Sequence, residues 1–330
     1  MREVENMKFY NPEFSLTSSE DKVISPESLV FSGGGIKGLA YVGAIKALEE
    51  KQLFQNIKRF AGASAGAITA ALLAIGMNGK ELDHQMSTVD FGTFLQKSNV
   101  DIQSLAHNPS QLLHLKVGPA VIFDEVSKLG LCDGSVFVKW LTSMFKLKGF
   151  DETTTFSQLY EKTGNELSVV LCYANCSKTV IASHKNDELS NMPIVTAVRG
   201  SMSIPLVFEP LRWNNNDYVD GGTMYNYPIE IFDDNPSPDK TLGFILSTQS
   251  SVLTPSRKED NGLLSHIGRI YESIMNVSYE YCFRMGNHHR TIFIDPAGVK
   301  TLDFKLTEEQ KNTLKTNGYK ATLAYFEDCI

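Results

Sequence analysis

Three consecutive glycines, which join a short apolar run to a helical pattern, constrain the fold of this chain more than any other feature. The stretch reads LVFSGGGIKGLAYVGAIKALEE from residue 29 to residue 50. Residues 29–32 are typical of a strand, and apolar residues recur at helical spacing in residues 36–51. A second unit of this kind follows, with a strand predicted at 57–61 and a helix at 65–76. Two successive strand–helix units predict an α/β fold, a central, mostly parallel sheet flanked by helices.

The rest of the chain continues without internal repeats or a linker. Further strands are predicted at 166–174, 178–184, 241–247 and 291–295, with a hairpin at 206–222 whose loop is residues 214–217. Further helices are predicted at 79–88, at 133–145 with Asp133 as the N-cap, and at 194–203, 263–284 and 308–326. We interpret residues 1–27 as a polar N-terminal lead-in and residues 28–330 as one domain, with C-terminal strands and helices at 241–328.

The glycine loop fits the dinucleotide-binding fingerprint G-x-G-x-x-G through Gly33, Gly35 and Gly38. That fingerprint expects an acidic residue at the end of the second strand to hold the ribose, and none stands there. A Walker A loop fails as well, because Leu39 follows Gly38 where a lysine is required. The glycine amides are therefore better explained as donors to a different negative charge, the oxyanion of an acyl-transfer reaction.

The second strand leads into Gly62–Ala63–Ser64–Ala65–Gly66, a G-x-S-x-G motif between a strand and a helix. This context is typical of a nucleophile elbow, in which the serine stands at a sharp turn before the helix N-terminus. A simpler interpretation of the motif is that its small residues only allow a turn to pack against a neighbouring helix. The strand before the motif and the apolar helix after it favour Ser64 as a nucleophile.

A serine nucleophile needs a base, and the sequence leaves two arrangements open. An α/β-hydrolase-type triad would place a histidine last, and His266, His288 or His289 meets that order. The other candidate is Asp220, which closes a predicted hairpin strand and precedes two glycines. An aspartate that starts an ordinary turn would look the same in sequence.

Taken in order, these motifs resemble the patatin-like phospholipase family. The resemblance rests on GGGIKG at 33–38, GASAG at 62–66 and DGG at 220–222, and AVRGSMSIPLVFEP at 197–210 is similar to the segment before the family's aspartate. It covers residues 29–227, the motif core. It implies a patatin-like three-layer sandwich as the fold, with residues 28–330 as a single catalytic domain.

Carried over by position, the resemblance implies a dyad without histidine, with Ser64 as the nucleophile and Asp220 as its only partner. An aspartate with an ordinary pKa is a weak base, so we expect burial to raise the pKa of Asp220. Lys37 stands where the family often has arginine. The oxyanion loop is implied at Gly33, Gly34, Gly35 and Gly38. The motif-supporting glycines are Gly62, Gly66, Gly221 and Gly222.

The implied function is hydrolysis of fatty-acyl esters of glycerophospholipids, as a phospholipase A1/A2-like enzyme or lysophospholipase, without a metal or cofactor. Its substrate would be a phospholipid or another acyl lipid at a membrane surface. Members of the family include effectors switched on by other molecules, so the resemblance is compatible with activation by a protein or a small molecule. A lipid-binding or effector module that needs a partner for activity is the second hypothesis, with residues 91–123 as a candidate lid.

Charge and composition restrict the location and the partners. The chain has 31 basic and 38 acidic residues and a net charge of −7, which argues against a general nucleic-acid binder. Residues 1–28 lack the apolar core of a secretion signal, and no apolar run approaches the roughly 20 residues of a membrane span. Five scattered cysteines favour a reducing compartment. We expect a cytoplasmic protein with peripheral membrane association, or one exported without a signal peptide.

Overall fold

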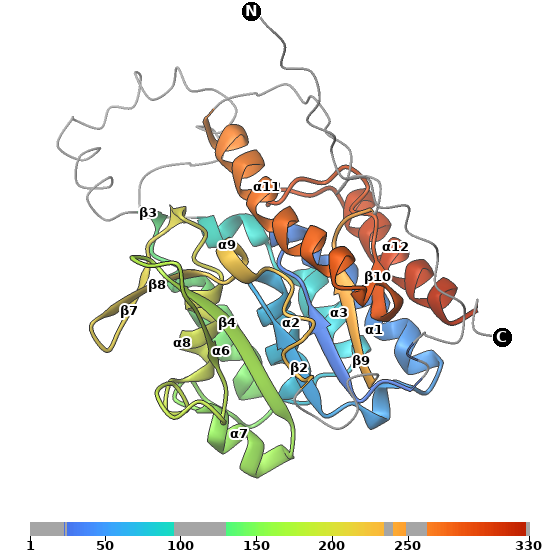
Figure 1. Cartoon of the computed structure of the whole chain (residues 1–330), viewed down its shortest axis with the longest axis horizontal. Coiled ribbons are helices and arrows are strands. Elements are labelled where there is room, and N and C mark those ends of the chain that lie inside the picture. Colours follow the sequence, from blue (N-terminus) through green and yellow to red (C-terminus); the bar gives the residue numbers. More distant parts are fainter. Residues whose placement is uncertain (1–22, 24, 96–129, 234–239, 249–262, 328–330) are drawn as a thin grey trace, which may run out of the picture.

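A mostly parallel sheet runs through the middle of the molecule (Figure 1). The computed structural model describes residues 23, 25–95, 130–233, 240–248 and 263–327. Within these residues the sheet has eight strands in the order β10–β9–β1–β2–β4–β8–β7, with β5 also paired to β4. The strands are β1 (Ser28–Phe31), β2 (Arg59–Gly62), β4 (Glu166–Tyr173), β5 (Thr179–Ala182), β7 (Leu211–Trp213), β8 (Asn216–Asp220), β9 (Thr241–Ile245) and β10 (Thr291–Phe293). β5 and β8 run antiparallel to β4, and the five strands from β10 to β4 are parallel.

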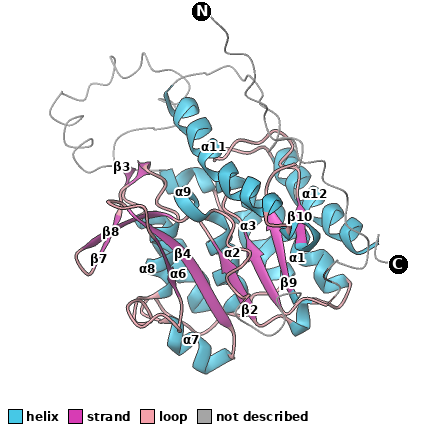
Figure 2. Cartoon of the chain, in the orientation of Figure 1, coloured by secondary structure: helices cyan, strands magenta, loops and turns pink. Residues whose placement is uncertain are grey.

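Helices cover both faces of this sheet (Figure 2). The side chains of β1 alternate between the faces, because Leu29 and Phe31 pack into the larger core cluster and Val30 packs into a smaller one with Tyr279 and Cys282. The α-helices are α1 (Ala40–Glu50), α2 (Ala65–Ala74), α3 (Gly79–Thr88), α6 (Ser135–Leu147), α7 (Phe156–Thr163), α8 (Ile194–Ser201), α9 (Gly222–Tyr225), α11 (Leu263–Arg284) and α12 (Glu308–Glu327). The larger cluster lies with α1, α2, α6 and α8, and the smaller one lies under α11. This arrangement confirms the predicted α/β fold of three layers.

Short irregular elements complete the described part. A second, two-stranded sheet pairs β3 (Gly130–Cys132) with β6 (Leu206–Phe208). The 3₁₀-helices are η2 (Gly35–Leu39), η3 (Phe54–Asn56), η4 (Phe91–Leu95) and η7 (Asn287–Arg290). Most of the predicted lead-in and most of the candidate lid, from residue 96 onward, lie outside the described residues. Helix α12 begins with a capping box, in which Thr307 and Gln310 exchange hydrogen bonds.

Three local predictions differ from the structure in detail. The helix predicted from residue 36 begins as the 3₁₀-helix η2 and becomes α-helical only at residue 40. Gly134, in the left-handed conformation, is the N-cap of α6, while the Asp133 carboxylate accepts a hydrogen bond from Ser135 N. The hairpin loop has two residues, Asn214 and Asn215, whose positive φ angles suit a two-residue hairpin turn.

The crossing of α1 and α12 depends on two glycines. A Cβ at Gly43 would overlap the backbone oxygen of Lys315, and a Cβ at Gly318 would overlap that of Ala40. We predict that Gly43→Ala lowers the free energy of unfolding by about 1–3 kcal/mol, because the added methyl group pushes two packed backbones apart. Urea unfolding measures this change. Gly268→Ala in α11 is the matched control, since a Cβ there meets only the Leu302 side chain at ordinary contact distance. Equal midpoints for the two variants would contradict the prediction.

Candidate active site

Ser64 stands at a strained turn between β2 and α2. Its backbone has φ 52° and ψ −123°, a combination that L-residues adopt at a cost of about 1–3 kcal/mol. The glycines on either side make the turn sterically feasible, because a Cβ at Gly66 would overlap the carbonyl group of Phe31 and a Cβ at Gly62 would overlap Gly66. The turn has the strand–serine–helix geometry of a nucleophile elbow, as the sequence predicts.

Asp220 reaches this elbow through the pairing of β4. The last residue of β2, Gly62, lies opposite Val169 of β4, and Asp220, the last residue of β8, lies opposite Leu171. Because β8 runs antiparallel to β4, it approaches from the carboxyl end of the parallel strands. It ends two β4 residues beyond the position that lies opposite the end of β2. One strand therefore brings together two residues that are 156 positions apart in the chain.

The two side chains are joined by a hydrogen bond. Ser64 Oγ donates to Asp220 Oδ2 at 2.6 Å, and both residues are buried, with Ser64 2% and Asp220 0% exposed. The other carboxylate oxygen, Oδ1, accepts the Gly222 amide at 2.7 Å. Ser201 connects the elbow to β4, since its Oγ accepts a hydrogen bond from the Ser64 amide at 3.0 Å and donates one to Val170 O at 2.6 Å. The geometry suits proton transfer from serine to aspartate.

Burial changes the proton affinity of this carboxyl group. It raises the pKa of Asp220 to about 7, and the Ser64 hydroxyl, the neighbouring Tyr271 hydroxyl and the Gly222 amide partly counteract that rise. The raised pKa confirms the expectation from the sequence. An aspartate with a pKa near neutrality is a stronger base than an exposed one and is still largely ionised at slightly alkaline pH.

The glycine loop lies beside the elbow, but its four glycines differ in what they do. The Gly33 amide donates to Asn226 O at 3.1 Å, so it is engaged within the protein. Gly35 has φ +58°, and it lines the cavity beside Ser64 together with Gly38. Gly34 packs against Leu246. We therefore correct the predicted oxyanion set, because Gly33 shapes the loop and does not have a free N–H for a substrate.

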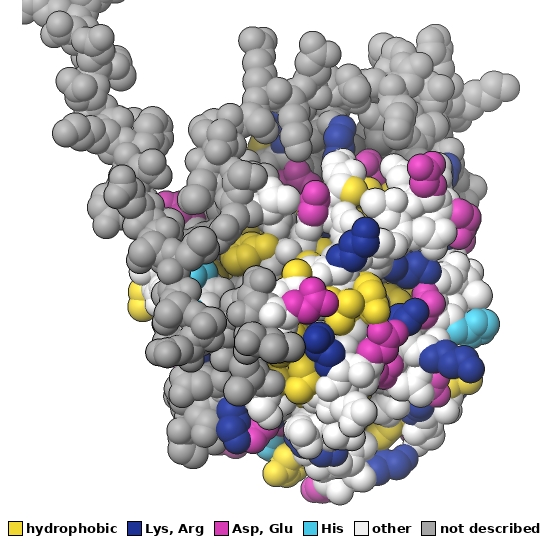
Figure 3. All heavy atoms as spheres, turned by 90° about the vertical axis from the view of Figure 1, so that its right-hand side faces the viewer, with side chains coloured by type: hydrophobic (Ala, Val, Ile, Leu, Met, Phe, Trp, Pro, Cys, Tyr) yellow, Lys and Arg dark blue, Asp and Glu magenta, His cyan; other side chains and the backbone are white. Residues whose placement is uncertain are grey.

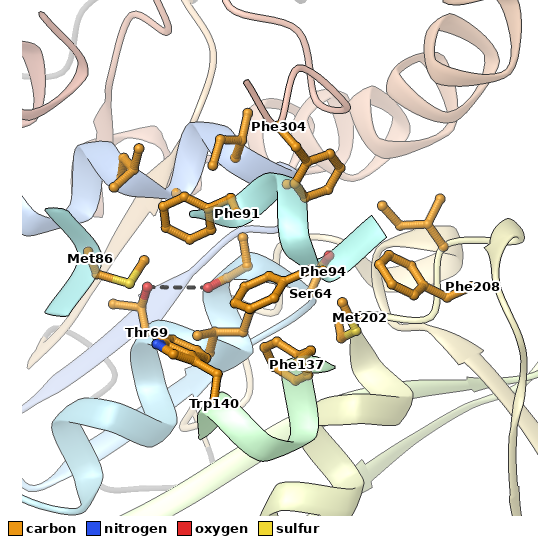
Figure 4. A pocket seen from close by; sticks show the side chains of 17 residues that line it. Ser64, Thr69, Met86, Phe91, Phe94, Phe137, Trp140, Met202, Phe208 and Phe304 are labelled. Atoms are coloured by element: carbon orange, nitrogen blue, oxygen red, sulfur yellow. Dashed lines mark hydrogen bonds between the residues drawn. The ribbon is translucent and has the colours of Figure 1, made fainter. Parts of the chain in front are cut away.

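An apolar cavity of about 50 Å³ adjoins Ser64. Aromatic side chains surround this space and come from η4, α6 and the segment before α12 (Figure 4). Two of them, Phe94 and Trp140, have ring centroids 5.4 Å apart. The lining residues are Gly35, Ile36, Gly38, Leu39, Ser64, Ala65, Ile68, Thr69, Met86, Phe91, Phe94, Phe137, Trp140, Met202, Ile204, Phe208 and Phe304. Such a lining would solvate a hydrocarbon chain and exclude water.

The histidines considered for a triad are placed elsewhere. The hydrogen-bond partners of Ser64 and Asp220 in the described residues include no histidine. His289 Nδ1 lies 2.7 Å from Gly286 O within its own turn, and His288 neighbours it in η7. His266 is exposed in the first turns of α11.

Several residues of the site were missed at the sequence level. Ser201, Asn226 and Tyr271 each contact the elbow, the loop or the aspartate from distant parts of the chain. Asn226 had the clearest signal, because it follows the D-G-G motif closely, whereas nothing in the pattern of α11 distinguishes Tyr271 from a core tyrosine.

Comparison with known proteins identifies the family. A family model described as patatin-like phospholipase matches residues 29–233. The chain belongs to the patatin-like phospholipase family. This member is 30% identical over 225 residues to a protein of Invertebrate iridescent virus 6 named "Probable lipid hydrolase 463L", with 68% of each chain covered. It is 28% identical over 304 residues to the uncharacterized protein YqhO of Bacillus subtilis (strain 168), covering 89% of this chain and 95% of that protein.

A solved structure agrees with the patatin-like fold. The crystal structure of VipD from Legionella pneumophila matches with a TM-score of 0.57 and 22% sequence identity, covering 92% of this chain and 67% of that one. The family and this likeness together establish the fold class of the patatin-like chain and place it among lipid-hydrolase relatives.

Three further properties of this family member concern the described ranges. None of their helices combines the length and the apolar character needed to cross a membrane. Nor do the described ranges bring three or more His, Cys, Asp or Glu side chains together in an arrangement that could hold a metal ion. On the face that lies to the right in Figure 1, acidic and basic side chains are interspersed with apolar ones (Figure 3).

The raised pKa of Asp220 predicts a pH-dependent stability. The folded protein binds this proton more tightly than the unfolded chain does, so the contribution of Asp220 to stability falls as the pH rises from about 4 to about 7. Asp220→Asn has no proton to lose. We expect the unfolding free energy of this variant, relative to wild type, to improve by up to about 4 kcal/mol between pH 4 and pH 8.

Urea unfolding at several pH values measures this difference. Asp187→Asn, at an exposed aspartate, gives the baseline for removal of one carboxylate. A constant difference between Asp220→Asn and wild type across this pH range would contradict the prediction.

Proposed function

We propose that this protein is a serine lipid acyl hydrolase that cleaves fatty-acyl esters through a Ser64–Asp220 dyad. The observation that carries the proposal is the 2.6 Å hydrogen bond between a strained, buried serine and a buried aspartate beside an apolar cavity. Membership of the patatin-like phospholipase family and the viral relative named as a lipid hydrolase support it.

In the first half-reaction Ser64 Oγ attacks the ester carbonyl carbon while its proton moves to Asp220 Oδ2. The carbonyl π electrons move to the ester oxygen, giving a tetrahedral oxyanion. When this intermediate collapses, the bond to the alcohol oxygen breaks, and the alcohol leaves with the proton from Asp220. The acyl group remains as an ester on Ser64.

Water completes the cycle in the second half-reaction. Asp220 takes a proton from water, the oxygen attacks the acyl carbon, and collapse expels Ser64 Oγ, which recovers the proton. The free fatty acid then leaves. No cofactor or metal is needed for either step; each half-reaction returns Asp220 to its ionised form, and the second restores the Ser64 hydroxyl.

Backbone amides of the glycine loop would stabilise the two oxyanions. Gly35 and Gly38 line the cavity beside Ser64, and Ala65, the residue after the nucleophile, lines it as well. Gly34 completes the loop. An amide aimed at a developing oxyanion contributes about 10²–10³ in rate, so this loop accounts for a large part of the proposed catalysis.

The apolar cavity favours an acyl lipid as the substrate, in a phospholipase A1/A2-like or lysophospholipase reaction. A volume of about 50 Å³ holds only a few methylene groups, so side chains such as Phe94 and Trp140 have to move aside for a long acyl chain. We predict that an activating protein or small molecule can favour this movement.

Substitution of the dyad tests the mechanism. We expect Ser64→Ala and Asp220→Ala each to lower fatty-acid release from phospholipid vesicles by at least about 10⁴-fold, because each removes a group that takes part in bond making or proton transfer. The wild-type rate should rise with pH through a midpoint near 7, where Asp220 ionises. Mass spectrometry of the lipids measures the acids released and the species consumed.

Histidine variants serve as controls for the triad alternative. His266→Ala, His288→Ala and His289→Ala are expected to keep the wild-type rate. Loss of activity in one of them would favour a triad, and full activity of Asp220→Ala would exclude the dyad.

We also propose a cytoplasmic protein with peripheral membrane association, or one exported without a signal peptide. A row of apolar side chains on the outer side of α11 supports the membrane contact. The row consists of Ile270, Ile274, Val277 and Tyr281, which are between 38% and 64% exposed. It lies on the helix whose Tyr271 faces Asp220, so a lipid surface at the row would lie near the site.

A charge placed in this row should weaken vesicle binding. We expect Val277→Glu to lower the partition of the protein onto phospholipid vesicles by about tenfold or more, since it removes an apolar group that would be buried in the lipid and adds a charge at the interface. Vesicle sedimentation measures the partition. Gln55→Glu adds the same charge at an exposed position in η3, which precedes β2 at the edge of the sheet opposite the site, and should bind like wild type. Equal partition of both variants would show that the row does not face lipid.

A further inference from the structure

Helix α11 lies outside the residues matched by the family model, yet it contacts both the surroundings of Asp220 and the glycine loop. The match ends at residue 233, and α11 begins at Leu263. Two consecutive residues of this helix, Tyr271 and Glu272, point into the protein. The Tyr271 hydroxyl lies beside Gly222 and the Asp220 carboxylate, whereas Glu272 contacts the glycine loop and the segment beside it.

The Glu272 carboxylate gathers three donors around one oxygen. Its Oε1 accepts the Thr301 hydroxyl at 2.7 Å, the Thr301 amide at 3.1 Å and Lys37 Nζ at 3.3 Å. The Lys37 side chain is only 9% exposed and belongs to η2, directly after Gly35 and Ile36. The positive charge and the hydrogen bonds hold the pKa of Glu272 below its ordinary value against the effect of burial, so the group is a carboxylate at neutral pH.

Thr301 connects Glu272 to the backbone of the glycine loop. Its carbonyl oxygen accepts the Ile36 amide at 3.3 Å, and the space next to Gly35 is filled by the same carbonyl group, which a Cβ at Gly35 would overlap. Gly35 is in the left-handed conformation, so the loop turns against Thr301 at this point. The loop is thus held on two sides, through the Lys37 side chain and through the backbone at residues 35 and 36.

A third residue of α11 holds the other end of the loop. Tyr279, two turns after Glu272, donates its hydroxyl to Gly33 O at 3.2 Å and accepts Asn226 Nδ2 at 3.0 Å. Asn226 O in turn accepts the Gly33 amide. The same helix therefore contacts the beginning of the loop, its middle and the aspartate.

We propose that Glu272 is a positioning residue that fixes the glycine loop relative to Ser64, acting through Lys37 and Thr301. The inference rests on the proposed function, because it assigns the loop amides to the oxyanion. Glu272 does not touch the reacting atoms. Its effect is to keep the amides of Gly34, Gly35 and Gly38 in the orientation that the oxyanion requires, which is the condition for their catalytic contribution.

Isosteric substitution tests this role. Glu272→Gln keeps the size of the side chain and an oxygen acceptor for Thr301 but removes the charge that faces Lys37. With a short soluble ester such as p-nitrophenyl butyrate, we expect kcat of the folded variant to fall by about 10²-fold with KM nearly unchanged, because a displaced loop impairs the transition state and not ester binding. Glu280→Gln, which breaks an exposed ion pair with Arg284 on the same helix, is the matched control and should keep the wild-type kcat.

Variants of Lys37 separate positioning from simple loss of stability. Lys37→Met should lower kcat to a similar extent, Lys37→Arg, which keeps the charge, should lower it far less, and the effects of Glu272→Gln and Lys37→Met should not add in the double variant. Urea unfolding reports the stability of each variant. A normal kcat in folded Glu272→Gln, with only a lowered unfolding midpoint, would overturn the proposal.

Hydrogen exchange provides a readout that does not depend on catalysis. In Glu272→Gln we expect faster exchange in peptides covering residues 30–41 and unchanged exchange in β4, whereas Glu280→Gln should match wild type in both. Unchanged exchange at the loop would overturn the positioning role even if no ester is hydrolysed. If Ser64→Ala keeps wild-type hydrolysis while the loop exchange changes as expected, the proposed function fails and the loop restraint stands.

Discussion

The buried carboxylate of Asp220 is the group on which the arrangement of the site depends. A carboxylate without contact to water needs hydrogen-bond donors from the protein, and here the Ser64 hydroxyl and the Gly222 amide provide them. These donors come from the elbow and the D-G-G turn, and the Tyr271 hydroxyl of α11 lies beside Gly222. The position of Asp220 therefore requires three separate parts of the chain to meet, and burial in turn gives the carboxyl group a pKa of about 7.

The parts of the site that could be predicted from the sequence are those fixed by local geometry. An elbow needs small residues on both sides of its serine, and the overlaps that side chains would cause at Gly62 and Gly66 explain why those positions are glycine. The same holds for Gly35, which has a positive φ. Such requirements leave a mark at fixed spacing in the sequence, so the fold class and the two central residues were accessible.

What could not be predicted depends on contacts between distant segments. The Gly33 amide is engaged by Asn226, a residue 193 positions later, and no local pattern distinguishes an amide that faces substrate from one that faces a carbonyl group. The roles of Tyr271 and Glu272 are of the same kind. In α11 they look like an ordinary core tyrosine and an ordinary helix glutamate, and only the packing of that helix over the site reveals their partners.

The location of Thr301 has a practical consequence for the size of the functional unit. The three motifs end at Gly222 and the family match ends at residue 233, but Thr301 supports the glycine loop and Phe304 lines the cavity. A fragment that stops after the family match would keep Ser64 and Asp220, yet it would lose the carboxylate that faces Lys37 and one wall of the cavity. The smallest fragment with a complete site therefore extends from Ser28 in β1 to at least Phe304, some seventy residues beyond the family match.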